Sequence, residues 1–386
     1  MSLLLSAIED CLRYRMAFCK FISANDAGAT GAHQSGFYIP LHSWRILFES
    51  PGIKGENKDK NVKIRWQSDF ETESRFIYYG RKTRNEYRIT RFGRGFPFLA
   101  PEHVGDLFVL IQVEHDYYHA YVIQGDEEIE SFFSSVGISA SQTNRLIETT
   151  SEDSRSVPTM EQLFQEYIAS LTVDFPDTAL ISAKAREMFQ TVQPRLVADP
   201  DALLLGWLDT EYQLFKAIEH DRYKERISTP FATVDELVAC ANTLLNRRKS
   251  RAGKSLEHHL AEVFRLHNLR FESQVITEDH KKPDFIFPGG AEYHDPGYGK
   301  DKLVFLGAKT TCKDRWRQIL NEADRIEEKH LFTLQQGISE NQLAEMYNHK
   351  VRLVVPRAYI NSFPAPFRPR ILSLDNFITM VKTRCS

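Results

Sequence analysis

The sequence lacks several features that would each define a class of protein. Its five cysteines are odd in number and include no CxxC pair, which argues against a disulfide framework and a cysteine-based zinc site. No hydrophobic run reaches the roughly 18 residues of a membrane-spanning helix, and the N-terminus shows no secretion-signal pattern. The formal net charge of −3 argues against a protein that coats nucleic acid without specificity. We therefore expect a cytoplasmic protein that does not bind membranes.

What is present divides the chain into two parts. Its 386 residues suffice for two ordinary domains. Residues 148–158 are polar and nearly free of apolar side chains, which is typical of the start of a linker, and a helix-like segment follows at 160–171. We predict a mainly β N-terminal domain at 1–152, a linker at 153–174 and an α/β C-terminal domain at 175–386.

Hydrophobic periodicity indicates individual elements in both parts. Short apolar runs predict strands at 107–113, 117–123, 285–287, 303–306, 330–333 and 351–355. One apolar stripe, formed by Leu256, Leu260, Val263 and Phe264, predicts a helix. A second stripe predicts another helix after residue 315; it is formed by Trp316, Ile319, Leu320, Ala323 and Ile326.

Three ionisable residues on consecutive predicted elements suggest phosphodiester hydrolysis. Asp284 opens one strand, Lys309 closes the next, and Glu322 lies thirteen residues later on the predicted helix. Two carboxylates can hold Mg²⁺, which prefers oxygen ligands, and a lysine can orient water and offset charge in the transition state. Singly, each residue is equally explained as a turn, a strand end or a solvated helix position.

The intervening sequence, Lys309-Thr-Thr-Cys-Lys-Asp-Arg-Trp-Arg-Gln-Ile-Leu-Asn-Glu322, resembles the active-site segment of EcoRII-type restriction endonucleases of the PD-(D/E)xK superfamily. In that group the acid usually found two residues before the lysine is missing, and a helix-borne Glu replaces it. Gly307 and Glu322 match these two positions. The resemblance extends through 246–257 and 281–285, where Glu257 matches a further active-site acid. The adjacent His258 and His259 point in different directions on a helix and do not form a metal-ligand pair.

Two further segments of the C-terminal part suggest DNA contacts. Lys313 and Arg315 can donate to guanine and Asp314 can accept from cytosine, and the resemblance implies that they read CC/GG outer base pairs. If helical, Arg315, Gln318 and Glu322 would share one face. A basic run suits phosphate contacts, or else a solvated helix end; its members are Arg247, Arg248, Lys249, Arg251 and Lys254. Relatives flip out the central base pair, and Tyr212 is a candidate for that pocket, although an aromatic at helical spacing is more often core.

The N-terminal part has its own DNA-binding pattern. Basic and aromatic residues alternate over 75–94, which suits phosphate and base contacts as well as a solvated pair of strands. This stretch and residues 23–40 resemble the effector DNA-binding domain of EcoRII, a β-pseudobarrel. The resemblance assigns effector-DNA contacts to His33, Arg81, Lys82, Asn85, Glu86, Arg88 and Arg94.

The resemblance implies a Mg²⁺-dependent type II restriction endonuclease that acts as a homodimer on double-stranded DNA. A second target copy bound at the N-terminal domain would activate cleavage. The alternative hypothesis is a DNA-binding regulator with an inactive nuclease-like domain. The complete set Asp284, Lys309 and Glu322 counts against it, because a degenerate site should have lost a member.

Overall fold

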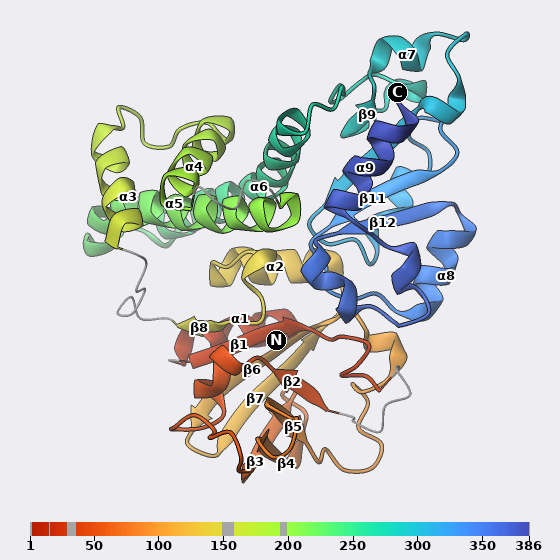
Figure 1. Cartoon of the computed structure of the whole chain (residues 1–386). Coiled ribbons are helices and arrows are strands. Elements are labelled where there is room, and N and C mark those ends of the chain that lie inside the picture. The colour runs from red at the N-terminus through yellow and green to blue at the C-terminus, as the bar shows by residue number, and fades with distance from the viewer. Residues whose placement is uncertain (1, 15, 29–35, 149–157, 194–198, 386) are drawn as a thin grey trace.

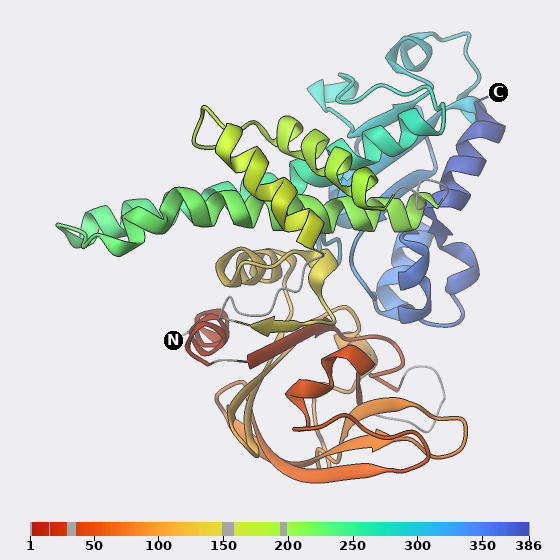
Figure 2. The same cartoon turned by 60° about the vertical axis from the view of Figure 1, so that its left-hand side comes forward.

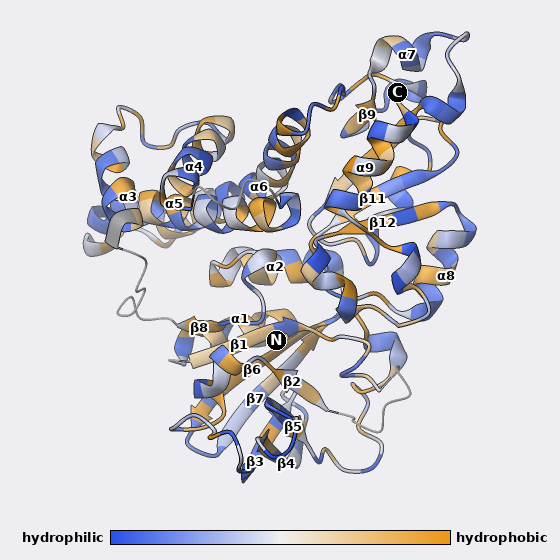
Figure 3. Ribbon diagram, viewed as in Figure 1, coloured by the Kyte–Doolittle hydropathy of each residue, from blue (hydrophilic) through white to orange (hydrophobic). Residues whose placement is uncertain are grey.

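The computed structural model describes residues 2–14, 16–28, 36–148, 158–193 and 199–385. Two β-sheets lie at opposite ends of the molecule, and a group of long helices lies beside them (Figure 1). Hydrophobic residues concentrate in the strands and on the inner sides of the helices, while the connecting loops are mostly hydrophilic (Figure 3). Within the described residues, no helix is long and apolar enough to cross a membrane.

The N-terminal part is built on an eight-stranded sheet with the order β2-β5-β4-β3-β7-β6-β1-β8. All neighbours are antiparallel except β3 and β7. Helix α1 (Leu3–Arg13) and helix α2 (Asp126–Val136) accompany the sheet. The strands are β1 (Met16–Phe21), β2 (Phe37–Ile39), β3 (Lys58–Trp66), β4 (Phe70–Tyr79), β5 (Glu86–Thr90), β6 (Leu107–Glu114), β7 (Tyr117–Ile123) and β8 (Leu146–Glu148).

Four helices follow the N-terminal sheet. They are α3 (Pro158–Ser170), α4 (Thr178–Val192), α5 (Pro200–Ser228) and α6 (Val234–Leu266). Asp199 caps the start of α5 by accepting from two backbone N–H groups, and Thr233 caps α6. The far ends of α5 and α6 extend as a hairpin away from the rest of the molecule (Figure 2).

The C-terminal part holds a five-stranded sheet with the order β13-β12-β11-β10-β9. Its strands are β9 (Phe285–Phe287), β10 (Val304–Lys309), β11 (Lys329–Thr333), β12 (Val351–Val355) and β13 (Leu372–Ser373). Only β9 runs antiparallel to its neighbour. Every residue of β11 is buried, as expected for a parallel strand covered on both faces. Helices α7 (Gly290–His294), α8 (Glu340–Asn348) and α9 (Leu374–Arg384) complete this part.

Helix α2 lies between the N-terminal sheet and the long helices α5 and α6 (Figures 1 and 2). One hydrophobic cluster runs from Ile129 and Phe132 of α2 to Trp207 of α5 and to Phe285 and Phe332 of the C-terminal sheet. The two parts of the chain are therefore packed together, and α2 is the helix that the N-terminal part places against the C-terminal part.

The six strands predicted with bounds are all present, whereas β1–β5, β8 and β13 had no predicted bounds. Strands β7, β9 and β12 have the predicted bounds, and β6, β10 and β11 differ by a few residues. The mainly β N-terminal part and the α/β C-terminal part are confirmed. The helix predicted at 160–171 corresponds to α3, which packs through Phe164 against α4 and α5 although it falls inside the predicted linker.

The helix predicted after residue 315 is wrong. Residues Arg315–Ile319 form a short 3-10 helix, and Glu322 lies in the turn after it, where Ala323 has a φ of +53°. Four of the five apolar positions of the stripe are buried and Leu320 is half-buried, but side chains from other segments bind the backbone and hold it in turns. Arg315, Gln318 and Glu322 therefore do not share a helical face.

Candidate active site

Asp284 and Lys309 meet where two neighbouring strands separate. Strands β9 and β10 pair with Phe285 opposite Leu306, so Asp284 and Lys309 lie next to each other at one end of the pair. The backbone N–H of Ala308 donates to Asp284 Oδ2 at 2.8 Å, and Lys309 Nζ lies 3.4 Å from the same oxygen. Gln274 Nε2 donates to Oδ1 at 3.3 Å. Asp284 is thus anchored on both oxygens beside the lysine.

Two further acids come close to this pair from other segments. Burial, followed by the negative charge of Asp284, raises the pKa of Glu322 to about 7, while nearby lysines led by Lys309 oppose the shift. The same two causes raise the pKa of Glu257, on α6, and Lys309 again opposes it. Both acids respond to the same Asp284 and Lys309, so the fold gathers all four side chains that the sequence singled out.

The carboxylates offer oxygen ligands of the kind that Mg²⁺ prefers. Within the described residues, however, no three His, Cys, Asp or Glu side chains stand close enough to form a ready metal cage. Mg²⁺ is commonly held by only one or two carboxylates, with waters and substrate phosphate completing its shell. Asp284 and Glu322 fit that mode of binding.

The segment Lys313–Arg315 is bound by three acids of the N-terminal part. The Lys313 ammonium contacts Asp106, and Arg315 forms a two-bonded ion pair with Glu130 at 2.7 and 2.8 Å. The carboxylate of Asp126 accepts from the backbone N–H groups of all three residues of the segment. Asp314 in turn accepts from the backbone N–H of Asp126 at 3.2 Å. We call Asp106, Asp126 and Glu130 the acidic clamp.

Sequence reasoning missed the acidic clamp. Asp126 and Glu130 lie in the run Asp126-Glu-Glu-Ile-Glu130 at the start of α2, which is a common place for acids because they favour a helix N-terminus. Asp106 is fully buried and carries no sequence signal of its own. The one available hint was charge complementarity between this acidic run and the Lys313–Arg315 segment, some 190 residues away in the chain.

Three arginines of the basic run on α6 form contacts within the protein that the sequence did not predict. Arg248 pairs with Glu219 at 2.8 Å and donates to the carbonyl oxygen of Ser134 on α2 at 2.9 Å. Arg251 is buried and pairs with Glu211 at 3.1 Å, so the structure contradicts its assignment as a phosphate contact. Arg247 donates to the Tyr223 hydroxyl and stacks over Phe175. Lys249 is exposed and remains accessible to a phosphate.

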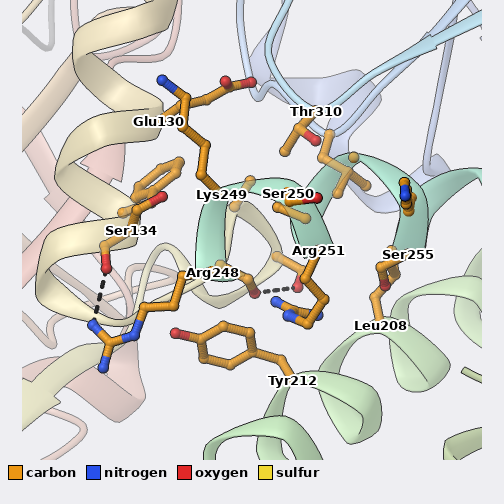
Figure 4. Close-up of a pocket in the computed structure, with 18 of the residues that line it drawn as sticks. Glu130, Ser134, Leu208, Tyr212, Arg248, Lys249, Ser250, Arg251, Ser255 and Thr310 are labelled. Atoms are coloured by element: carbon orange, nitrogen blue, oxygen red, sulfur yellow. Dashed lines mark hydrogen bonds between the residues drawn. The ribbon is translucent and has the colours of Figure 1, made fainter. Parts of the chain in front are cut away.

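Residues of the candidate active site, of the basic run on α6 and of α2 line a cavity of about 430 Å³ (Figure 4). Glu130 and Ser134 of α2, Tyr212 of α5, the turns of α6 around Arg248 and Ser255, and Thr310 surround it in the close-up. Glu257, Lys309 and Arg315 also line it. Tyr212 is buried, and the Arg251 guanidinium lies 4.9 Å from its ring centre. Glu257 and Lys309, the predicted base-reading Arg315 and α2 of the N-terminal part therefore face one space.

The predicted effector-DNA residues divide into two groups. Arg81, Lys82, Asn85 and Arg94 are exposed, as a DNA-binding surface requires. Arg88 is buried and donates to the carbonyl oxygen of Gly36 and to Glu86, so the structure contradicts its assignment to direct base reading. Arg88 on strand β5 thus pairs with the half-buried Glu86 two residues away instead of facing DNA. His33 lies outside the described residues.

An acid and a lysine side by side on two strands of a mixed sheet, with further acids from flanking segments, are the arrangement expected of a PD-(D/E)xK nuclease. Two family models match the chain: the EcoRII C-terminal model over residues 215–378 and the model of restriction endonuclease EcoRII, N-terminal, over residues 13–144. The type II restriction enzyme EcoRII of Escherichia coli is 38% identical, and the alignment covers 95% of this chain and 94% of the relative. The chain belongs to the EcoRII family of type II restriction enzymes.

Two other proteins show weaker similarity. The type II restriction enzyme SsoII of Shigella sonnei is 26% identical over 151 residues, covering 36% of this chain and 48% of the relative. A structure of metal-depleted Ecl18kI in complex with uncleaved, modified DNA superposes with a TM-score of 0.46 at 18% identity, covering 59% of this chain and 84% of that chain.

Proposed function

We propose that this restriction endonuclease cuts double-stranded DNA by Mg²⁺-dependent hydrolysis, at a short target with CC/GG outer base pairs. The observation that carries the proposal is the convergence of Glu257, Asp284, Lys309 and Glu322, which come from four separate segments of the sequence. Family membership supports catalysis over the alternative of an inactive regulator.

Each residue of this set has a role that its surroundings favour. Asp284 and Glu322 would hold Mg²⁺, which would polarise the scissile phosphate and acidify the attacking water. Lys309, held beside Asp284, orients that water and offsets negative charge in the transition state. Glu257 lines the cavity beside Lys309, where its carboxylate is placed to act on the attacking water or on a metal-bound water.

Plasmid cleavage tests this proposal. Purified protein, MgCl₂ and a plasmid carrying many candidate sites should yield discrete fragments, and excess chelator should prevent their formation. Sequencing the fragment ends should give one short site with CC and GG at its outer positions. Intact plasmid after incubation with Mg²⁺ and a short activating duplex would refute the proposed catalysis, and ends without a common sequence would refute the proposed target.

Lys313, Asp314 and Arg315 are proposed to read the outer base pairs. In this structure Arg315 bonds both oxygens of Glu130, and the same paired donors match O6 and N7 of guanine. The acidic clamp therefore occupies donors that the target would need.

Two variants separate base reading from phosphate binding. Arg315→Ala should lose about 1–3 kcal/mol of discrimination between the target and a scrambled duplex. Lys249→Ala should weaken binding to both duplexes similarly and reduce the salt-dependence slope by about one. Fluorescence anisotropy at several salt concentrations measures both effects. An unchanged target-to-scrambled ratio in Arg315→Ala would remove the base-reading assignment.

A second copy of the target, bound by the N-terminal domain, is proposed to activate cleavage. The acidic clamp holds Lys313–Arg315, and Arg248 holds the end of α2 through the Ser134 carbonyl, so α2 spans the cavity from one DNA-contact element to the other. DNA cannot use these groups until α2 leaves. The exposed Arg81, Lys82 and Arg94 of the N-terminal domain, proposed as a β-pseudobarrel with boundaries at 1–152, offer the surface for the second copy.

A homodimer is proposed because one active site cuts one strand. The α5–α6 hairpin carries Val234, Leu237 and Val238 at helical spacing i, i+3 and i+4, and all three are exposed. An apolar stripe of this kind suits the same stripe of a second copy across a two-fold axis.

Charge on the stripe should therefore break the dimer. Leu237→Lys combined with Val238→Lys should sediment as a monomer and should nick plasmid rather than linearise it. Thr243→Lys, on the opposite side of α6, is the matched control and should remain dimeric. A doubly substituted protein that stays dimeric in sedimentation equilibrium would place the interface elsewhere.

The cavity also supports the proposed pocket for a flipped base. Tyr212 is the aromatic side chain of α5 in this space, and a base could stack there once α2 has moved away. A target with 2-aminopurine at its centre should brighten on binding to the wild type and less with Tyr212→Ala. Equal brightening would exclude Tyr212 as a stacking partner.

A further inference from the structure

Lys329, the first residue of β11, is a buried lysine that sequence analysis did not single out. Its ammonium donates to the backbone carbonyl of Glu322 and, at 2.6 Å, to that of Ala323. The ring of Phe305 lies beneath it, 5.1 Å from Nζ. Removing an ammonium from water costs free energy, which hydrogen bonds to main-chain carbonyls offset. Lys329 therefore does more than fill space in the core.

The turn that Lys329 binds carries the proposed metal ligand Glu322. This turn belongs to no regular helix or strand; single turn bonds run from the Glu322 N–H to the Ile319 carbonyl at 3.2 Å and from the Ile326 N–H to the Ala323 carbonyl at 2.9 Å. Ala323 is fully buried with a left-handed φ of +53°. Two side chains of one neighbouring segment, residues 278–281, hold its ends. Lys281 Nζ donates to the Asn321 carbonyl at 2.9 Å, and Glu278 accepts from the backbone N–H of Asp324 at 3.1 Å. Lys329 holds the centre.

The position of Glu322 explains why such support is needed. An acid on a helix is oriented by the hydrogen bonds of the helix, whereas an acid on a turn depends on whatever holds the turn. Lys329 binds the carbonyl of Glu322 itself, so it acts directly on the backbone that carries the carboxylate.

We propose that Lys329 is a positioning residue for Glu322, and that it sets the affinity of the site for divalent metal. The inference rests on the proposed role of Glu322 as a metal ligand. It predicts that Lys329 affects metal binding and leaves metal-independent DNA binding unchanged.

Lys329→Met keeps much of the side-chain volume and removes the donors. It should raise the Mg²⁺ concentration for half-maximal single-turnover cleavage about 10- to 100-fold, as other residues that orient metal ligands do. The cleavage rate at saturating Mg²⁺ should fall much less. Mn²⁺ binding to the protein–DNA complex, measured by electron paramagnetic resonance, should weaken by a similar factor. Lys350→Met, an exposed lysine paired with Glu327, is the matched control and should match the wild type.

Two further variants make the result decisive. Lys329→Arg restores a donor and should recover part of the lost Mn²⁺ affinity. In a Glu322→Gln background, Lys329→Met should weaken Mn²⁺ binding no further, because the ligand it positions is already lost. If Lys329→Met does not fold, Lys281→Met tests the same turn and should raise the half-saturating Mg²⁺ severalfold.

The inference and the function on which it rests can fail separately. If Glu322→Ala cleaves like the wild type, the role of Glu322 is wrong. If Glu322→Ala is inactive but a folded Lys329→Met shows wild-type Mg²⁺ and Mn²⁺ dependence, the positioning role alone is overturned. For Lys281→Met used as the substitute, an unchanged half-saturating Mg²⁺ has the same consequence.

Discussion

Asp284→Ala and Glu322→Ala are each expected to abolish cleavage of an activated two-site plasmid while DNA binding stays measurable. Each variant removes a carboxylate proposed to hold Mg²⁺, and Asp284→Ala also frees Lys309 from the oxygen that fixes it. Lys309→Ala should lose at least about 10²–10³-fold in rate, because alanine can neither orient water nor offset transition-state charge. Quenched time courses on agarose gels measure the loss.

Glu327→Ala is the matched control for Glu322→Ala. Glu327 is an exposed acid five residues away that pairs with Lys350, so its loss should leave the rate unchanged. Cleavage by Glu322→Ala at a rate near that of the wild type would remove the claim that the displaced acid of the superfamily resides at Glu322.

Glu130→Ala is expected to accelerate cleavage of a plasmid that carries a single site, without any added duplex. The ion pair between Glu130 and Arg315 is partly buried and has two bonds, and a hydrogen bond to a charged group contributes about 1.5–3 kcal/mol. Losing that stabilisation should shift the ratio of closed to open molecules by roughly tenfold or more. With saturating activating duplex, variant and wild type should reach the same rate, because both are then open.

Glu128→Ala provides the comparison on the same helix. It removes an equal charge from an exposed position of α2 outside the acidic clamp, and should leave single-site cleavage slow. A chain that begins at residue 158 removes the whole clamp and should be fully active without duplex. It retains α3, which packs on α4 and α5, whereas a start at 175 would expose that surface. Slow single-site cleavage by Glu130→Ala would show that the clamp does not control access.

The sequence predicted four of the five strands of the C-terminal sheet, β9 to β12, because buried strands are local features; the two-residue strand β13 was not predicted. Apolar runs such as 351–355 carry their own signal, and the strand pair then places Asp284 beside Lys309. The active-site set followed from the resemblance and from this pairing. The helix predicted after residue 315 failed because spacings of three and four residues also arise in turns whose apolar side chains are buried by tertiary contacts.

Long-range partners account for the other differences. The burial of Arg88 and Arg251 depends on groups from distant segments, such as the Gly36 carbonyl and Glu211, which the sequence around each arginine does not indicate. The acidic clamp likewise depends on how α2 packs against the C-terminal part. The sequence shows which residues are charged, whereas the fold determines which charged side chains are exposed to DNA and which pair with each other.

The most direct test compares cleavage rates of the full-length wild type on one-site and two-site plasmids, with and without a short duplex carrying the target. We proposed that a second site bound at the N-terminal domain releases the acidic clamp. On that proposal we expect slow cutting of the one-site plasmid, faster cutting of the two-site plasmid and stimulation of the former by the duplex. Lys82→Ala combined with Arg94→Ala should lose the stimulation and keep the catalytic residues intact. Equal rates on both plasmids, with no response to duplex, would contradict the account.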